Sequence, residues 1–241
     1  MKKVIVFCLA FSSLVVRAQE LTTSKEVINK YLEVTKIGEN YKAITDITLN
    51  STSESQRGVA ETEMKFAVPF KSSMSIFSNG MEVMSSKYDG NTLARKSSFG
   101  GGNGPGQQPK TGEEAKAEAL RTFPFLEAIY DENGYTHKLA GTENVNDKPA
   151  YVVEVTDPTK KTWKDYYDKA TGLKVKTFSV NESPRGKFES TVLYENYKAL
   201  KGSPILFALV KKQVGQMGEI VSELQSIKIN KGLKEKDFEV K

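Results

Sequence analysis

Short runs of alternating apolar and polar residues, separated by turn residues, fill most of this 241-residue chain. In residues 61–68, for example, Met64, Phe66 and Val68 fall on one side of an extended backbone and their polar neighbours on the other. Such alternation is typical of strands with one buried face and one face in water, as antiparallel sheets have. The hydrophobic fraction of 38% agrees with a one-sided sheet. We therefore predict a mainly β (α+β) protein built on an antiparallel sheet.

Turn residues set the expected strand boundaries. Asn79-Gly80 predicts a hairpin that joins residues 72–78 to a strand beginning at Met81, and Asp89-Gly90 precedes a strand over 92–99. Weaker alternation marks residues 41–50. The second half is predicted to be a meander, with strands over 135–142, 150–157, 162–168, 173–180, 188–199, 205–214 and 219–229 and a short edge segment in the tail, 233–240. Because strands of the same character lie on both sides of the glycine-rich loop at residues 100–112, we expect one domain over residues 19–241.

A first short helix is predicted near the N-terminus. Thr23 and Glu26 have the spacing of a capping box, and an apolar stripe follows them over residues 24–36. Gly38 is the expected stop.

A second helical region is predicted in the middle of the chain, after a glycine-rich loop over residues 100–112. Thr111 and Glu114 again have capping-box spacing, and the helix is expected to reach about Thr122. Pro124 interrupts it and can occupy the first turn of a further short helix.

The first 18 residues have the three parts of a secretion signal. Lys2 and Lys3 precede an apolar run over residues 4–16, and Val16-Arg17-Ala18 supplies small residues at the −3 and −1 positions of a cleavage site. The run is shorter than the roughly 20 residues of a membrane-spanning helix. We therefore expect residues 1–18 to be a cleaved signal peptide and the mature chain to lack a transmembrane segment.

The mature chain is nearly neutral and has no cysteine. Removal of Lys2, Lys3 and Arg17 leaves 32 basic and 30 acidic residues, so the charge gives no reason to expect a nucleic-acid partner. The only cysteine, Cys8, lies inside the signal, which excludes disulfides and thiol chemistry in the mature protein.

The sequence shows no catalytic or metal-binding pattern, so we predict no catalytic residues, no metal and no cofactor. The only histidine, His137, lies in a predicted strand without a nucleophile motif, and we expect it to be a half-exposed strand residue. Glu61 and Glu63 share a solvent face, and Asp165 and Asp168 are expected at a strand end and its turn. An active-site carboxylate pair stays open as a lesser alternative, because residues distant in sequence can converge in space.

The remaining distinctive feature is an apolar surface rich in methionine, a flexible residue that adapts to varied apolar shapes. We expect a lined cavity or, as the plainer alternative, an ordinary filled core. The candidate lining residues come from consecutive strands: Met64, Phe66, Met74, Ile76, Met81 and Val83. The candidate cover, or lid, comes from the two short helices: Leu120, Phe123, Phe125, Leu126 and Ile129.

Several segments, taken in order, resemble a known family. They are the first helix at residues 25–32, the strand, turn and strand over 148–155 and 166–176, and the closing Asp237-Phe238. This layout is similar to that of the outer-membrane lipoprotein-sorting (LolA/LolB/LppX-like) proteins, and the likeness is strongest over residues 134–200. The resemblance implies a half-open, strongly curved antiparallel sheet, a half-barrel, with short helices that cover its concave apolar face.

The resemblance also implies a function. Members of that group with known roles carry lipids or the acyl chains of lipoproteins across the periplasm, and an arginine latches the lid in the carrier. Arg95 and Arg121 are the candidates for that arginine here.

We therefore expect a non-enzymatic carrier or binder of lipids or lipoprotein acyl chains, exported to a Gram-negative periplasm or secreted. Its partners would be a lipid or an acylated lipoprotein, together with an envelope protein. The alternative is a structural or interaction module of the cell envelope with a filled core, and a hydrolase with an unrecognised carboxylate site ranks third.

The first testable prediction concerns processing. Because small residues occupy the −3 and −1 positions, the exported protein should begin at Gln19. N-terminal sequencing of the protein from the exporting cell checks this, and retention of residues 1–18 or a lipid on Cys8 would contradict it.

Overall fold

The computed structural model of the protein describes residues 20–56, 58–68, 70–98, 108–183, 186–215 and 218–240. The predicted signal peptide, residues 1–18, lies outside the described residues, as do residues 100–107 of the predicted glycine-rich loop. The end of that loop is described. Lys110–Thr111 forms the short strand β6, and Gly112 is the first residue of a helix.

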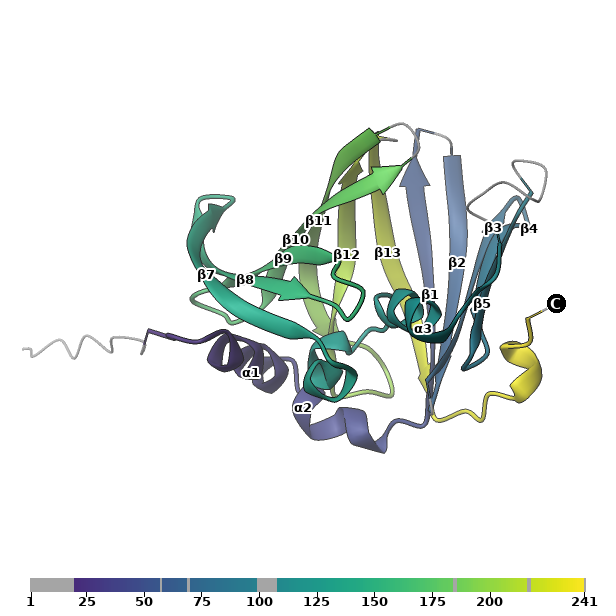
Figure 1. Ribbon diagram of the computed structural model, residues 1–241, viewed down its shortest axis with the longest axis horizontal. Helices are drawn as coiled ribbons and strands as arrows, with labels where there is room; N and C mark the ends of the chain where they lie inside the picture. Colours follow the sequence, from purple (N-terminus) through teal and green to yellow (C-terminus); the bar gives the residue numbers. More distant parts are fainter. Residues whose placement is uncertain are drawn as a thin grey trace, which may run out of the picture.

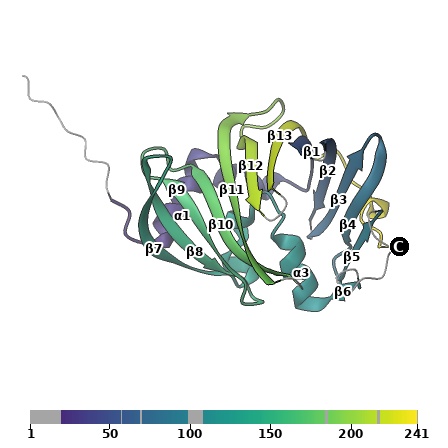
Figure 2. The same ribbon diagram turned by 90° about the horizontal axis from the view of Figure 1, so that it is seen from above.

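Thirteen strands form one antiparallel sheet in the described part of the chain, and the sheet curves into an open half-barrel (Figures 1 and 2). The prediction of a mainly β protein with a curved antiparallel sheet is confirmed. Besides β6, the strands are β1 (Asp46–Ser55), β2 (Gly58–Ala67), β3 (Lys71–Ser78), β4 (Met81–Tyr88), β5 (Thr92–Ser97), β7 (Thr136–Val145), β8 (Lys148–Thr156), β9 (Thr162–Asp168), β10 (Lys174–Ser183), β11 (Gly186–Ala199), β12 (Leu206–Gly215) and β13 (Gly218–Ile229).

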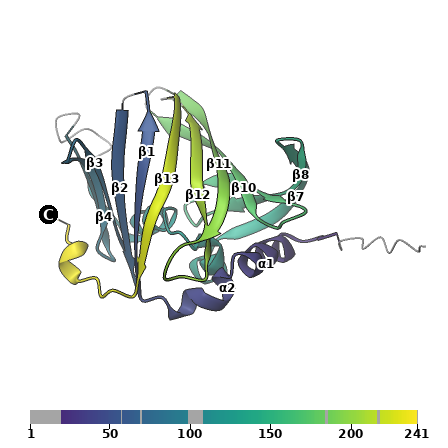
Figure 3. The same cartoon turned by 180° about the vertical axis from the view of Figure 1, so that it is seen from behind.

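The sheet consists of two meanders, which are joined by the pairing of β1 with β13. The order is β6-β5-β4-β3-β2-β1-β13-β12-β11-β10-β9-β8-β7, so the first and last strands of the chain lie side by side in the middle of the sheet (Figure 3). The two edges, β6 and β7, are consecutive in the chain. The segment between them therefore runs from one edge of the sheet to the other.

Short helices cover the concave side and one end of the sheet. The α-helices are α1 (Ser24–Val34), α2 (Ile37–Asn40) and α3 (Gly112–Leu120), and the 3₁₀ turns are η1 (Tyr41–Ala43), η2 (Leu126–Ile129), η3 (Asp131–Asn133) and η4 (Glu235–Asp237). The capping box of Thr23 and Glu26 is confirmed. The one predicted at Thr111 is wrong, because the Thr111 side chain caps nothing and Glu114 instead pairs with Lys110 at 2.6 Å.

The C-terminal tail does not extend the sheet, contrary to the expectation of an edge segment. It forms η4, and it is tied to β2, whose Lys65 lies 3.4 Å from Asp237. Phe238 is buried, so the tail is packed against the domain. A strand at this point would have had to pair with β2 or β3, and both already have two neighbours.

Hydrogen bonds between side chain and backbone hold the junction of β1 and β13 where β1 begins and β13 ends. The buried carboxylate of Asp46 accepts hydrogen bonds from the backbone amides of Lys231 (2.9 Å) and Gly232 (3.0 Å). The next residue, Ile47, is 1% exposed and belongs to the main hydrophobic core, which also includes Val27 of α1 and Val153 of β8.

The second prediction tests this junction. Ile47→Ala should lower the free energy of unfolding by about 2–5 kcal/mol, because it leaves a cavity where the two meanders meet. The exposed Val59→Ala on β2 is the control and should change stability by about 0.5 kcal/mol or less. Chemical denaturation measures both free energies. An effect of Ile47→Ala as small as that of Val59→Ala would show that packing at the junction does not stabilise the fold.

Candidate binding cavity

The chain crosses the mouth of the half-barrel between its two edges, through α3, η2 and η3 (Figure 2). This cover presents apolar side chains to the concave face. Phe123 packs edge-on against Phe66 (5.7 Å between ring centroids), Phe70 (5.5 Å) and Phe125 (5.6 Å). Leu120, Phe125 and Leu126 are buried. The predicted cover residues therefore lie together over the sheet.

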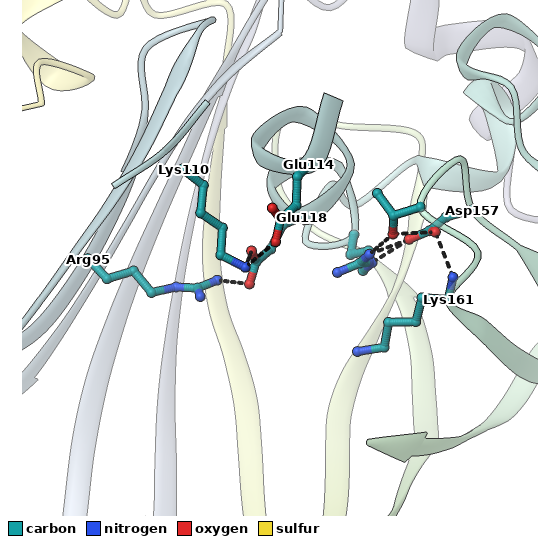
Figure 4. A network of polar contacts seen from close by, with 8 residues as sticks. Arg95, Lys110, Glu114, Glu118, Asp157 and Lys161 are labelled. Carbon is teal, nitrogen blue, oxygen red and sulfur yellow. Dashed lines mark hydrogen bonds and ion pairs between the residues drawn. The ribbon is translucent and has the colours of Figure 1, made fainter. Parts of the chain in front are cut away.

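Ion pairs tie the cover to both sides of the open sheet (Figure 4). At the β5–β6 edge, Arg95 lies 2.6 Å and Lys110 3.0 Å from carboxylate oxygens of Glu118 on α3. At the opposite side, the guanidinium of Arg121 donates two hydrogen bonds to Asp157, in the turn between β8 and β9. Both arginines predicted as latch candidates thus connect α3 to the sheet.

The charges of these two carboxylates are stabilised by their partners. Burial opposes ionisation of Asp157, but hydrogen bonds from Thr159, Arg121 and the backbone of Lys161 outweigh it and lower the pKa of Asp157. Burial likewise opposes ionisation of Glu118, and hydrogen bonds from Lys110 and Arg95 lower its pKa. Both sides of the cover are therefore held by ionised pairs at neutral pH.

Beneath the cover lies a cavity of about 410 Å³, here called the first cavity, whose walls differ in character. One wall is apolar and belongs to β1, β2, β12 and β13, with Leu49, Met64, Leu209 and Leu224 facing the space. The other wall is polar and comes mainly from β9, β10 and β11, with Asp165, Lys174, Thr177, Ser179 and Tyr194.

A buried ionic cluster forms the base of the polar wall. Lys174 pairs with Glu127 of the cover, and both side chains are almost fully enclosed. The Asp165 carboxylate lies 4.0 Å from Lys174 and accepts hydrogen bonds from the Trp163 indole (3.0 Å) and the Thr177 hydroxyl. The cluster therefore connects the cover to β9 and β10 and supplies the polar groups of the wall.

The cluster shifts the protonation of its members. Burial raises the pKa of Asp165, against the opposing attraction of the Lys174 cation. Burial also opposes the charge of Lys174, but the carboxylates of Glu127 and Asp165 outweigh it and raise the pKa of Lys174 well above its ordinary value. Lys174 is therefore a permanent cation whose charge is already matched.

A second cavity of about 760 Å³ lies between the lower ends of β1 and β2, η1 and the cover. Ile47, Phe66, Phe70 and Ile129 are among the residues that line it. Phe123 lines both cavities, so it lies where the two approach each other.

Of the six predicted lining residues, three line a cavity or pocket within the described residues and three do not. Met64 pairs with both Leu49 and Met74 and faces the first cavity. Phe66 lines the second cavity. Phe66 and Met74 together line a small pocket of about 50 Å³ under α3.

The other three residues, Ile76, Met81 and Val83, line none of these described spaces. A β-bulge after Ile76 breaks the expected alternation, so Met84 rather than Val83 lies opposite Ile76. Met81 pairs with Ser78 at the hairpin end and is 68% exposed.

Sequence reasoning missed the polar wall. A register shift between Lys174 and Lys176 turns Lys174 toward the cavity, which strict alternation would not predict. Asp165 was expected at a strand end but lies inside, in the alternating run of Trp163, Asp165 and Tyr167. Asp168 is not its partner, because it accepts backbone hydrogen bonds from Ala170 and Thr171 in the following turn.

His137 is more buried than expected. Its Nδ1 lies 2.9 Å from Ser24 Oγ and its Nε2 3.7 Å from Asp131. The Ser24 hydroxyl is also within hydrogen-bond distance (3.3 Å) of the His137 carbonyl oxygen, and neither residue lines any of the three cavities, so the contact joins α1 to β7. Within the described residues no group of His, Asp and Glu side chains has the geometry of a metal site. In the same part of the chain, no helix is long and apolar enough to cross a membrane.

The fold is similar to that of a solved LolA superfamily structure. A LolA superfamily protein from Nitrosomonas europaea superposes with a TM-score of 0.58 and 15% identity, over 91% of this chain and 99% of that one. Two other similar structures, each with a TM-score of 0.49 over 88% of this chain and 97% of theirs, are an outer membrane lipoprotein-sorting protein domain from Vibrio parahaemolyticus (16% identity) and a DUF1329 family protein from Desulfovibrio piger (14% identity). No protein-family model and no curated protein sequence matches the chain.

The third prediction concerns the Arg121–Asp157 pair. Arg121→Gln should lower the free energy of unfolding at pH 7 by about 1–3 kcal/mol, because it leaves the buried Asp157 carboxylate without its cation. The folded pKa of Asp157 is lowered, so its contribution is complete above about pH 4 and is lost as the pH falls through the folded value. The difference between wild type and variant should therefore shrink in acid.

Thermal and denaturant unfolding at several pH values measure this difference. Lys187→Gln removes an exposed pair with Glu182 and serves as the control, with an expected effect below about 1 kcal/mol. A difference for Arg121→Gln that is independent of pH would contradict the assignment.

Proposed function

We propose that this protein is a non-enzymatic binder or carrier of lipids or of lipoprotein acyl chains in the cell envelope. The observation that carries the proposal is the first cavity, which lies between the concave face and a cover held by ion pairs at both sides. Its volume of about 410 Å³ falls within the about 300–1,000 Å³ typical of small-molecule sites. The secretion signal expected at residues 1–18 supports the location.

The apolar wall supports an acyl ligand. Each methylene group that leaves water for such a surface contributes about 0.8 kcal/mol, so a short stretch of chain suffices for measurable binding. Leu49, Met64, Leu209 and Leu224 offer this surface, and Met64 can adapt its shape to a flexible chain.

The two cavities together give space for a longer chain. Phe123 is only partly buried, and it is held by ring contacts rather than by hydrogen bonds. Rotation of this ring would join the first cavity to the second. An acyl chain that enters the first cavity could then extend toward Phe66 and Phe70.

The alternative of an envelope module with a filled core fits less well. A filled core requires close packing between sheet and cover, whereas spaces of about 410 and 760 Å³ remain there. An envelope protein partner is compatible with both functions.

The fourth prediction tests the apolar wall. Met64→Asp should weaken the binding of a fluorescent fatty acid about tenfold or more, because ligand entry strips water from a carboxylate placed in the apolar wall. Glu63→Gln is the matched control, since Glu63 is next in sequence but pairs with Lys65 on the opposite face. Its affinity should equal that of wild type.

Fluorescence titration measures these affinities, and circular dichroism with thermal unfolding confirms that the variants are folded. Met64→Leu keeps the wall apolar and should bind like wild type. The proposal fails if the wild-type protein binds no acyl probe, or if Met64→Asp binds it as tightly as wild type.

A further inference from the structure

Cations outnumber carboxylates in the first cavity. Its lining includes Arg121, Lys161, Lys174 and Lys211, but only two acids, Glu127 and Asp165. Arg121 is neutralised by Asp157 and Lys174 by Glu127. Lys161 and Lys211 form no ion pair within the part of the chain that the structure describes.

Lys211 is the more isolated of the two. It lies on β12 opposite Tyr194 of β11 and Ser222 of β13, and its ammonium is 5.8 Å from the centre of the Tyr194 ring. Lys211 is accessible to solvent, and it lines the first cavity among the other residues of its wall. Burial and the nearby Lys174 cation lower the pKa of Lys211. The Glu127 carboxylate opposes these effects only in part, so the charge of Lys211 is incompletely compensated by the protein.

Lys161 lies in the turn between β8 and β9, next to the Arg121–Asp157 pair. Its backbone amide is bound to Asp157, while its side chain extends away from that carboxylate (Figure 4). Asp157 attracts the Lys161 ammonium from a distance, but burial and the neighbouring Arg121 outweigh this attraction and lower the pKa of Lys161. A second incompletely compensated cation thus lines the same space.

The unpaired charge adjoins the apolar wall. Leu209 is two residues before Lys211 on the same strand, and both line the first cavity. Leu224 and Met64 continue the apolar surface toward β13 and β2. A molecule that meets Lys211 with one end can therefore place an apolar tail along this wall.

We propose that the first cavity selects amphiphiles with an anionic headgroup, a carboxylate or a phosphate, and that Lys211 binds this headgroup with support from Lys161. The inference rests on the proposed function and specifies its ligand class. An anion would form charge-assisted hydrogen bonds with these ammonium groups and offset their cost of desolvation. A neutral or zwitterionic headgroup would leave a net positive charge enclosed.

The test compares ligands that share one acyl chain and differ in headgroup charge. Wild-type protein is titrated with palmitoyl lysophosphatidylglycerol and its zwitterionic counterpart, palmitoyl lysophosphatidylcholine, by displacement of a fluorescent fatty-acid ester. Palmitate and monopalmitoylglycerol form the second pair, so a carboxylate is distinguished from a phosphate. We expect the anionic member of at least one pair to bind about tenfold more tightly.

Lys211→Met keeps the length and apolar stem of the side chain and removes its charge. It should reduce the preference for the anion to about twofold or less while the neutral ligands bind as before. Lys212→Met is the matched control, because Lys212 points to the other face and pairs with Glu195 at 2.9 Å. It should keep the full preference.

The outcomes separate this inference from the proposed function. If no amphiphile binds, the proposed function fails and the inference fails with it. If charged and neutral ligands bind equally, or if Lys211→Met keeps the preference while folded, the headgroup inference is wrong and the acyl-binding function stands.

Discussion

The pairing of β1 with β13 is the interaction on which the whole molecule depends. It joins the first strand of the chain to the last and so unites two meanders in one curved sheet. Because the joining strands lie in the middle, both edges belong to the central part of the chain. The segment between β6 and β7, which contains α3, η2 and η3, therefore crosses the open side of the sheet and forms the cover. The location of the cavity follows from this topology.

The cavity combines two kinds of wall because the strands around the β1–β13 pairing and the strands β9 to β11 differ in the residues they turn inward. The strands near β1 and β13 contribute Leu49, Met64 and Leu224, while β9 and β10 contribute Asp165 and Lys174. Buried charges in such a wall are tolerated only when they are matched. Glu127 matches Lys174, and it does so from the cover, so the cover and the polar wall stabilise each other.

Much of the fold could be predicted from the sequence because strand alternation, turns and the Thr23 cap are local signals. The predicted cover residues do lie together over the sheet. The polar half of the cavity could not be predicted, because β-bulges decide which residues face inward and leave no mark in the pattern. The shift beside Lys174 turns that side chain inward, and the bulge after Ile76 displaces Val83 from the face expected for it. Lys211 lies in register with Tyr194 of β11 and Ser222 of β13 on the strands next to it in the chain, but alternation alone does not tell which face of β12 the cavity occupies.

An open sheet has two free edges, and unpaired strand edges invite the strands of other molecules. Here each edge is a poor template for such growth. β6 is only two residues long, whereas β7 carries a register shift before Gly141 and charged side chains at Lys138 and Glu143. The Ser24 hydroxyl of α1 also lies within hydrogen-bond distance of a carbonyl oxygen of β7. The half-barrel can thus stay open without becoming a nucleus for aggregation.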